Sequence, residues 1–177
     1  MAQQPQQPQQ PQQPQQPQWT SRPEIDTNFN LTNHRAQNVT CLATHGTKLL
    51  AGSADGRITT YDLERRSSPE VATTPRSKTG HERSIVGCSW FHDGGVFVSA
   101  CCAGNVVVWD ANVMKAACRF DLPALASAAL SPMSTGPTAA VCAVGTGDGA
   151  CRLCDARSGA CHSSLAHGRG AVAALAW

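Results

Sequence analysis

The sequence has 177 residues, of which 41% are hydrophobic, and a formal net charge of +2. Such a balance of basic and acidic side chains gives no reason to expect general binding to nucleic acids or membranes, which usually needs a concentrated basic face. No apolar stretch approaches the roughly 18–20 residues that cross a bilayer, and the N-terminus lacks the basic start and apolar centre of a signal peptide. We therefore expect an intracellular protein whose partners are other proteins.

The core available to this chain is small. Ile, Val, Leu and Phe together number 30 residues, a low share, although the low net charge argues against general disorder. The 9 cysteines are an odd number and too sparse for a disulfide scaffold, so we expect reduced thiols.

Residues 1–32 are expected to form a disordered Gln/Pro-rich tail and lead-in. From Gln3 to Gln18 the tripeptide Gln-Gln-Pro recurs. Proline at every third place restricts the backbone and removes a hydrogen-bond donor, which favours an extended polyproline-II coil. Strand patterning begins only near Val39. We place a single domain over residues 33–177.

An internal repeat organises this domain. Short apolar segments typical of β-strands begin 47, 41 and 46 residues apart. Each of the first three is followed by a second apolar strand, a tight turn, and a third strand that ends on an aspartate. The expected first strands are residues 39–43, 86–90, 127–131 and 173–177, the second strands are residues 49–52, 96–100 and 140–144, and the closing aspartates are Asp62, Asp110 and Asp155.

Tandem units of this kind are typical of the blades of a β-propeller. We expect blades over about residues 33–66, 81–115 and 120–160, with the start of a further blade at residues 166–177. Residues 64–84 are expected to be a solvated link. Since propellers generally need at least four blades to close, the length predicts a truncated chain of marginal stability.

Histidines stand at a fixed distance before the aromatic residue of the repeats. His81 follows a glycine and lies 28 residues before Trp109, and His34 lies 27 residues before Tyr61. This frame, at a period in the forties, resembles the WD-repeat propeller. The resemblance implies an all-β fold, a WD-repeat β-propeller fragment of about three blades plus the first strand of a fourth.

The WD-repeat family implies structural roles for these residues. In it a His, a strand Ser or Thr, a turn Asp and the Trp form a buried hydrogen-bonded chain, which stabilises a blade when every member is satisfied. No blade here has the full set, and the third retains least, so we expect it to be the weakest. The first blade has His34, Asp55, Tyr61 and Asp62, with Ala51 at the Ser place; the second has His81, Ser99, Trp109 and Asp110, with Ala103 at the Asp place; the third has Asp148 and Asp155.

Two kinds of chemistry can be weighed from motifs. The sequence has no Gly-x-Ser-x-Gly nucleophile motif, and blade structure accounts for the recurring His and Asp, so we expect no enzyme activity. A second pattern is spaced like a set of zinc ligands, but cysteines three apart on a strand point to opposite faces and would not converge on one metal. Its members are Cys151, Cys154, Cys161 and His167. We expect no metal site and no cofactor.

Several stretches resemble the Cockayne syndrome group A family of WD-repeat proteins more closely than a generic repeat. They are residues 51–68, 106–120, 130–135, 143–161 and 171–177. The resemblance implies a non-catalytic substrate-recognition subunit of a cullin-RING ubiquitin ligase, acting in transcription-coupled nucleotide-excision repair in the nucleus. Its partners would be the damaged-DNA-binding adaptor and repair and transcription proteins, with no direct nucleic-acid binding, membrane association or small-molecule substrate.

Adaptor-binding propellers often carry a Trp-Asp-x-Arg box. Here Cys154-Asp155-Ala156-Arg157 approximates it, so the resemblance implies adaptor contacts by Asp155 and Arg157. The alternative for Arg157 is a surface turn residue after a strand. Two other functions stay open: an unrelated WD-repeat scaffold, for example in RNA processing or signalling, and a truncated product without function.

Overall fold

The computed structural model describes residues 38–65, 70–75, 77, 80–122, 130–134, 140–166, 168–172 and 175. The chain divides into two compact units, Met1–Asn30 and Leu31–Trp177, and all described residues belong to the second. Their regular structure consists of strands, which confirms the all-β prediction. No helix long and apolar enough to cross a membrane occurs in this part of the chain.

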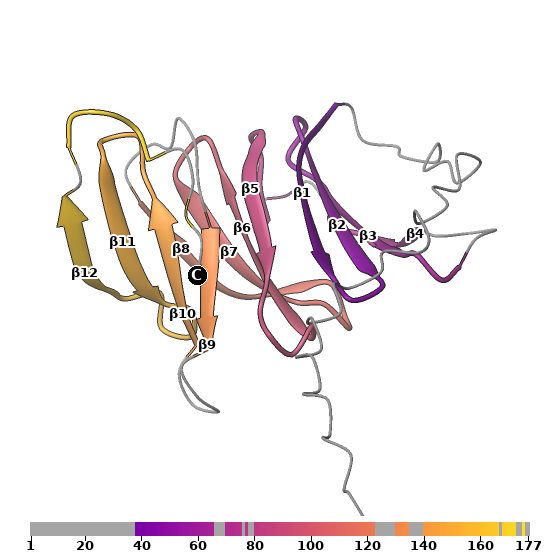
Figure 1. Cartoon of the computed structure of the whole chain (residues 1–177). Coiled ribbons are helices and arrows are strands. Elements are labelled where there is room, and N and C mark those ends of the chain that lie inside the picture. Colours follow the sequence, from indigo (N-terminus) through magenta and orange to yellow (C-terminus); the bar gives the residue numbers. More distant parts are fainter. Residues whose placement is uncertain are drawn as a thin grey trace, which may run out of the picture. The chain divides into compact units, whose positions relative to one another are not determined.

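The described strands form three antiparallel sheets, and each sheet takes its four strands in chain order (Figure 1). Sheet 1 contains β1 (Val39–His45), β2 (Lys48–Ser53), β3 (Ile58–Asp62) and β4 (Glu70–Thr73). Sheet 2 contains β5 (Ile85–Trp90), β6 (Val96–Cys101), β7 (Asn105–Asp110) and β8 (Lys115–Asp121). Sheet 3 contains β9 (Leu130–Ser134), β10 (Ala140–Gly145), β11 (Ala150–Asp155) and β12 (Cys161–Ala166).

The fourth strand of each sheet was not expected from the sequence. β4 lies inside the segment that the sequence suggested was a solvated link, and β8 and β12 extend past residues 115 and 160, where the expected blades ended. These outer strands are half-exposed and carry charged and small polar residues, so they lack the apolar runs of the inner strands.

Two expected first strands fall wholly or partly outside the described residues. Of the strand expected at 127–131, residues 130 and 131 belong to β9, and residues 127–129 lie outside the described part of the chain. The strand expected at residues 173–177 lies outside the described residues apart from Leu175, which is not in a strand.

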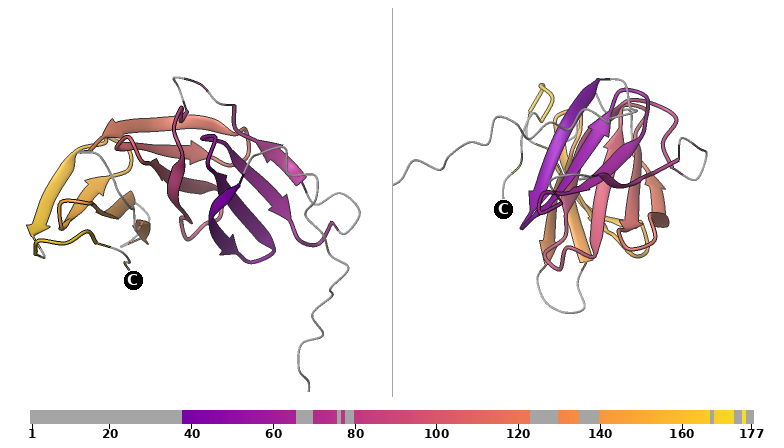
Figure 2. Two further views of the ribbon diagram at one scale, coloured as in Figure 1. Left: turned by 90° about the horizontal axis from the view of Figure 1, so that it is seen from above. Right: turned by 90° about the vertical axis from the view of Figure 1, so that its right-hand side faces the viewer.

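The sheets pack face against face through their inner strands. β1 lies against β5 and β5 lies against β9, and in Figure 2 the sheets follow one another in chain order from indigo to yellow. One apolar cluster joins sheets 1 and 2 and includes Leu50, Ile58, Ile85, Phe97 and Trp109; a second joins sheets 2 and 3 and includes Val98, Val106, Val108, Cys142 and Val144. The core therefore lies between blades rather than within one.

β7 shows why the inner strands are apolar along their whole length. Val107 and Trp109 belong to the cluster shared with sheet 1, whereas Val106 and Val108 belong to the cluster shared with sheet 3. Successive residues of a strand point to opposite faces, and both faces of this strand are covered. An unbroken run of Val and Trp is the result.

In sheets 1 and 3, the turn between the second and third strands packs closely against the backbone of the next repeat. Gly56 has φ +88°, and a Cβ there would lie 2.8 Å from the carbonyl oxygen of His81 and 2.9 Å from that of Arg83. Gly149, at the same place in the third repeat, has φ +83° and approaches the carbonyls of Gly168 and Gly170. Glycine is required here both for the left-handed backbone and for the close contact.

Candidate functional site

Three of the residues implied by the repeat frame meet in sheet 2. His81 lies in the segment that leads into β5, Ser99 lies on β6 and Trp109 lies on β7, and all three are at most 2% exposed. The indole Nε1 of Trp109 donates to Ser99 Oγ at 2.7 Å, and His81 Nε2 lies 2.7 Å from the same oxygen. The Ser99 oxygen can accept from Trp109 while its hydroxyl donates to His81 Nε2, and in that arrangement the imidazole proton lies on Nδ1.

A Ser–His hydrogen bond also occurs in the active sites of hydrolases, but this one is structural. Ser99 is 0% exposed and His81 is 1% exposed, and the Ser99 oxygen already accepts from Trp109. A nucleophile must reach its substrate. Ser99 is therefore part of the blade.

His81 Nδ1 is the one buried side-chain polar atom without a hydrogen-bond partner among the described residues. The family's complete hydrogen-bonded chain includes a turn aspartate, and the second repeat has Ala103 at that place. Burial, and secondarily the Arg119 charge, lower the pKa of His81 to about 4. The histidine is therefore neutral in the folded protein at neutral pH.

His81 should make the fold acid-sensitive. Because the pKa is about 4 in the fold and about 6.5 in an unfolded chain, the unfolded chain binds more protons between these values. The contribution of His81 to stability is present above pH 6.5 and is lost as the pH falls toward 4. We expect the free energy of unfolding, measured by urea denaturation, to fall by about 2 kcal/mol between pH 7 and pH 5 from this group.

Two variants test whether the loss of stability in acid comes from His81. Ala103→Asp supplies a carboxylate for Nδ1, which should add about 1 kcal/mol at pH 7 and reduce the acid loss by favouring the imidazolium. His162→Gln removes a histidine whose side chain is 62% exposed and should leave the acid loss unchanged. An acid loss that is the same in wild type and Ala103→Asp would contradict this role for His81.

Sheet 1 has only some of the residues that the WD-repeat frame expects in each blade. His34 lies outside the described residues. Asp55 stays within its own turn, where its carboxylate accepts the Arg57 backbone N–H at 3.2 Å and forms an ion pair with the Arg57 guanidinium at 3.4 Å. Tyr61 takes the aromatic place and is 2% exposed, and burial followed by the Glu70 charge raises its pKa.

Sheet 3 holds its turn aspartate by a different partner. Asp148 forms a two-pronged ion pair with Arg152 of β11, with Nη1–Oδ1 at 3.0 Å and Nη2–Oδ2 at 2.6 Å. The buried hydroxyl of Thr146 bonds to both side chains. These hydrogen bonds hold the pKa of Asp148 well below its usual range. Sequence reasoning missed Arg152, although an Asp followed four residues later by Arg across a tight turn was a usable signal.

The aspartates that close the third strands have one shared role. In each sheet the carboxylate accepts backbone N–H groups of the turn into the fourth strand, which explains why Asp recurs there. Asp62 accepts from Glu64 at 3.1 Å, Asp110 accepts from Asn112 at 2.8 Å, and Asp155 accepts from Arg157 at 2.7 Å and Ser158 at 2.9 Å. The hydrogen bonds from Ser158 and Arg157 lower the pKa of Asp155.

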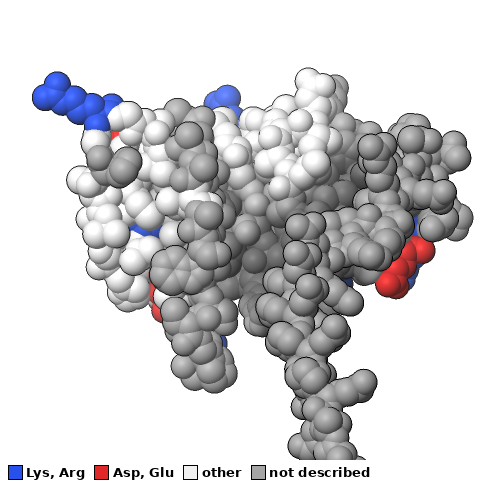
Figure 3. All heavy atoms as spheres, viewed as in Figure 1, with Lys and Arg blue, Asp and Glu red and all other residues white. Residues whose placement is uncertain are grey.

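The turn after Asp155 presents the candidate adaptor contact. Ala156 is 3% exposed and anchors the turn in the cluster between sheets 2 and 3. Arg157 is exposed, and its guanidinium has no partner among the described residues. Asp155 thus shapes the turn, and Arg157 is the side chain that is available to a partner. On the face shown in Figure 3, charged side chains are few and stand apart on a largely uncharged surface.

The cysteines with zinc-like spacing lie on β11 and β12. Cys151 is paired with Leu165, Cys154 is paired with Cys161, and His167 lies outside the described residues. The part of the chain that the structure describes contains no group of three or more His, Cys, Asp or Glu side chains that could hold a metal ion.

Blade-like four-stranded sheets, each with an aspartate-capped turn before its last strand, define a segment of a WD-repeat β-propeller. The family model described as "WD domain, G-beta repeat" matches residues 26–62 and 73–110, and each match ends on a closing aspartate. The chain therefore carries WD repeats over these two segments. This fold is generally non-catalytic and mediates protein–protein interactions.

Among curated proteins, the chain is 30% identical to "WD repeat-containing protein ATCSA-1" of Arabidopsis thaliana over 147 residues, which cover 76% of this chain and 32% of that protein. It is 41% identical to "Elongator complex protein 2" of Drosophila melanogaster over 63 residues, which cover 34% of this chain and 8% of that protein. The chain thus spans about a third of the first relative's length and less than a tenth of the second's.

Solved structures agree on the fold. The WD40 repeats of RRP9 superpose with a TM-score of 0.65 at 18% identity, covering 80% of this chain and 42% of that chain. The computationally designed Ika4 protein superposes with a TM-score of 0.61 at 20% identity, covering 80% of both chains.

Proposed function

We propose that this chain is the propeller segment of a substrate-recognition subunit of a nuclear cullin-RING ubiquitin ligase that acts in transcription-coupled nucleotide-excision repair. The observation that carries the proposal is the 30% identity with ATCSA-1 over 147 residues, which cover 76% of this chain. Such a subunit performs no chemistry. It holds a client protein near the ubiquitin-charged enzyme.

The turn at the end of β11 supports a contact with the damaged-DNA-binding adaptor. The carboxylate of Asp155 accepts two consecutive backbone N–H groups, which orders the turn and leaves the Arg157 guanidinium in solvent. An arginine presented in this way suits a carboxylate or a row of backbone carbonyls on a partner, because its donors form a planar fork.

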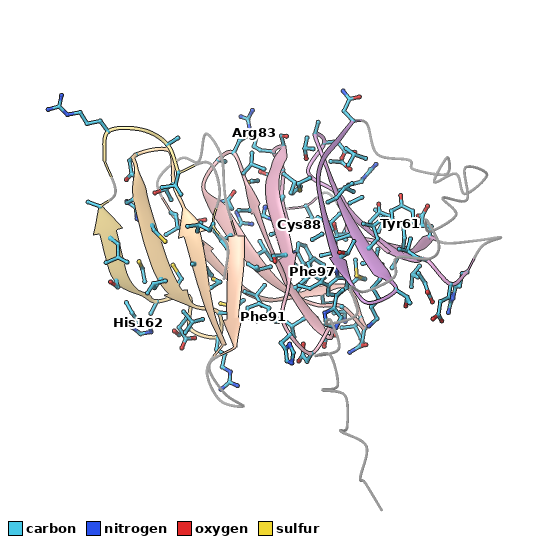
Figure 4. The ribbon with its side chains drawn as sticks, viewed as in Figure 1. Tyr61, Arg83, Cys88, Phe91, Phe97 and His162 are labelled. Carbon is cyan, nitrogen blue, oxygen red and sulfur yellow. The ribbon has the colours of Figure 1, made fainter. Side chains whose placement is uncertain are left out.

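The proposal predicts that Arg157→Glu weakens adaptor binding by about tenfold or more, the effect of losing one arginine anchor. Binding of the purified adaptor to the full chain is measured by titration calorimetry or surface plasmon resonance. Arg83→Glu is the matched control: Arg83 is exposed, and Figure 4 shows it at the opposite end of the sheets from His162, which lies 4.0 Å from Asp155.

Two outcomes would count against the proposal. Equal losses in both charge-reversal variants would point to a general electrostatic effect and would remove Arg157 from the contact. If the wild-type chain did not bind the adaptor, the alternative function of an unrelated WD-repeat scaffold would be favoured. The match to an Elongator subunit keeps this alternative open.

A further inference from the structure

Two cysteines from consecutive repeats meet between sheets 1 and 2. Cys41 lies on β1, and Cys88 lies 47 residues later on β5. Their sulfur atoms are 3.5 Å apart, close enough for a thiol–thiol hydrogen bond. Figure 4 shows Cys88 on β5, the strand that packs against β1. The two thiols thus bridge separate blades.

Local backbone features bring the sulfur atoms together. The pairing of β1 with β2 shifts register between Val39 and Cys41, and the pairing of β5 with β6 shifts at the corresponding place, between Ile85 and Gly87. Opposite Cys41 on β2 stands Gly52, where a Cβ would lie 2.6 Å from the Cys41 sulfur. Any larger residue at position 52 would displace this thiol. The space is therefore specific to the Cys41 side chain.

The two thiols differ in access and in proton affinity. Cys88 is 9% exposed and belongs to the cluster between the sheets, whereas Cys41 is only partly buried at its edge. The hydrogen bond with Cys88 lowers the pKa of Cys41, and the same contact, with burial, raises the pKa of Cys88. An oxidant from solvent would meet Cys41 first, and the lowered pKa favours its thiolate, the form that reacts.

We propose that Cys41 and Cys88 form a peroxide-sensitive pair that closes to a disulfide between the first two blades. The Cys41 thiolate attacks one oxygen of hydrogen peroxide, breaks the O–O bond and becomes a sulfenic acid, while the departing hydroxide takes up a proton to leave as water. The Cys88 sulfur then attacks the Cys41 sulfur and displaces its hydroxyl, which takes up the Cys88 proton and leaves as a second water. The two thiols lose two electrons and the peroxide gains them.

The geometry suits this step. The sulfur atoms must approach from 3.5 Å to about 2.0 Å, a movement that side-chain rotation and a small shift between the sheets can supply. The bond would add a covalent link between sheets that are held by side-chain packing and by hydrogen bonds from Trp90 to the Ala43 carbonyl and from Lys48 to the Gly94 carbonyl. Two cysteines of sheet 3 differ from Cys41 in proton affinity. Burial raises the pKa of Cys142 and Cys154, which disfavours their thiolates.

The test treats the full chain with hydrogen peroxide after removal of reductant, alkylates the remaining thiols and maps disulfides by mass spectrometry. Trypsin and chymotrypsin are combined because cleavage after Trp90 separates Cys88 from Cys101 and Cys102. We expect a linked peptide pair containing Cys41 and Cys88, at several-fold higher yield than any other pair. Oxidised chain should also melt several degrees higher than reduced chain.

Wild-type chain in urea is the geometric control, and the linked pair should largely disappear there. Cys88→Ser should leave Cys41 as a sulfenic acid that dimedone traps, whereas Cys102→Ser, at an exposed turn cysteine, should leave the yield of the linked pair unchanged. Equal yields of the pair in folded and urea-unfolded chain would overturn the proposal. So would oxidation that joins other cysteines while Cys41 and Cys88 stay alkylated.

Discussion

Ser99→Ala is expected to lower the free energy of unfolding by about 2–4 kcal/mol, because it leaves two buried polar groups without a partner. The Ser99 oxygen accepts from Trp109 Nε1 at 2.7 Å and contacts His81 Nε2 at 2.7 Å. His81 Nδ1 is already unpaired, so after the change neither ring nitrogen would have a partner. Urea denaturation followed by Trp fluorescence measures the loss.

Ser89→Ala is the matched control for this prediction. Ser89 lies on the neighbouring strand β5, is only partly buried and makes no side-chain hydrogen bond among the described residues. It should change the free energy of unfolding by no more than about 0.5 kcal/mol. If Ser99→Ala and Ser89→Ala had equal small effects, the buried chain would not be what stabilises sheet 2.

Phe97→Ala is expected to cost about 3–5 kcal/mol, since it removes a fully buried ring from the centre of the cluster between sheets 1 and 2. Phe97 is 0% exposed, lies edge-on to Trp90 at 5.5 Å between ring centroids, and stacks on Trp109 at 5.9 Å. Figure 4 shows it within sheet 2. The cavity left by the missing ring would also weaken the packing of sheet 2 against sheet 1.

Leu165→Ala on β12 provides the comparison. Leu165 is 57% exposed, so its truncation should cost less than about 1 kcal/mol in the same urea experiment. A loss for Phe97→Ala as small as that for Leu165→Ala would mean that the sheets do not depend on the packing between them. Hydrogen exchange would locate the effect, because loss of packing between sheets should expose amides of both β2 and β6.

Residue patterns predicted the inner strands well and the outer strands poorly. β2 and β7 carry apolar runs because they are buried on two faces, and β3, β7 and β11 end in aspartates because each of these carboxylates caps a turn. β4, β8 and β12 carry no such signal because one side of each is exposed. The expected first strand of sheet 3 overlaps β9 at residues 130 and 131, and its start lies outside the described residues.

The repeat frame identified residues more reliably than it identified their partners. Asp148 occupies the expected turn place, yet it binds Arg152 of its own sheet, an arrangement that depends on which side chains are within reach after folding. The expectation that sheet 3 is the weakest stays a prediction. Faster hydrogen exchange in β10 and β11 than in β6 and β7 would support it.

The period of the repeat, the all-β class and the positions of the turn-capping aspartates follow from the order of residues, because strand alternation, Gly turns and Asp caps act over a few neighbours. Contacts between repeats do not follow from that order. The Cys41–Cys88 contact and the close approach of Gly56 to the carbonyls of His81 and Arg83 each arise where sheets or turns from distant parts of the chain meet. Such contacts depend on how the blades pack, since distances of a few ångströms between residues 47 positions apart are set by the stacking of whole sheets.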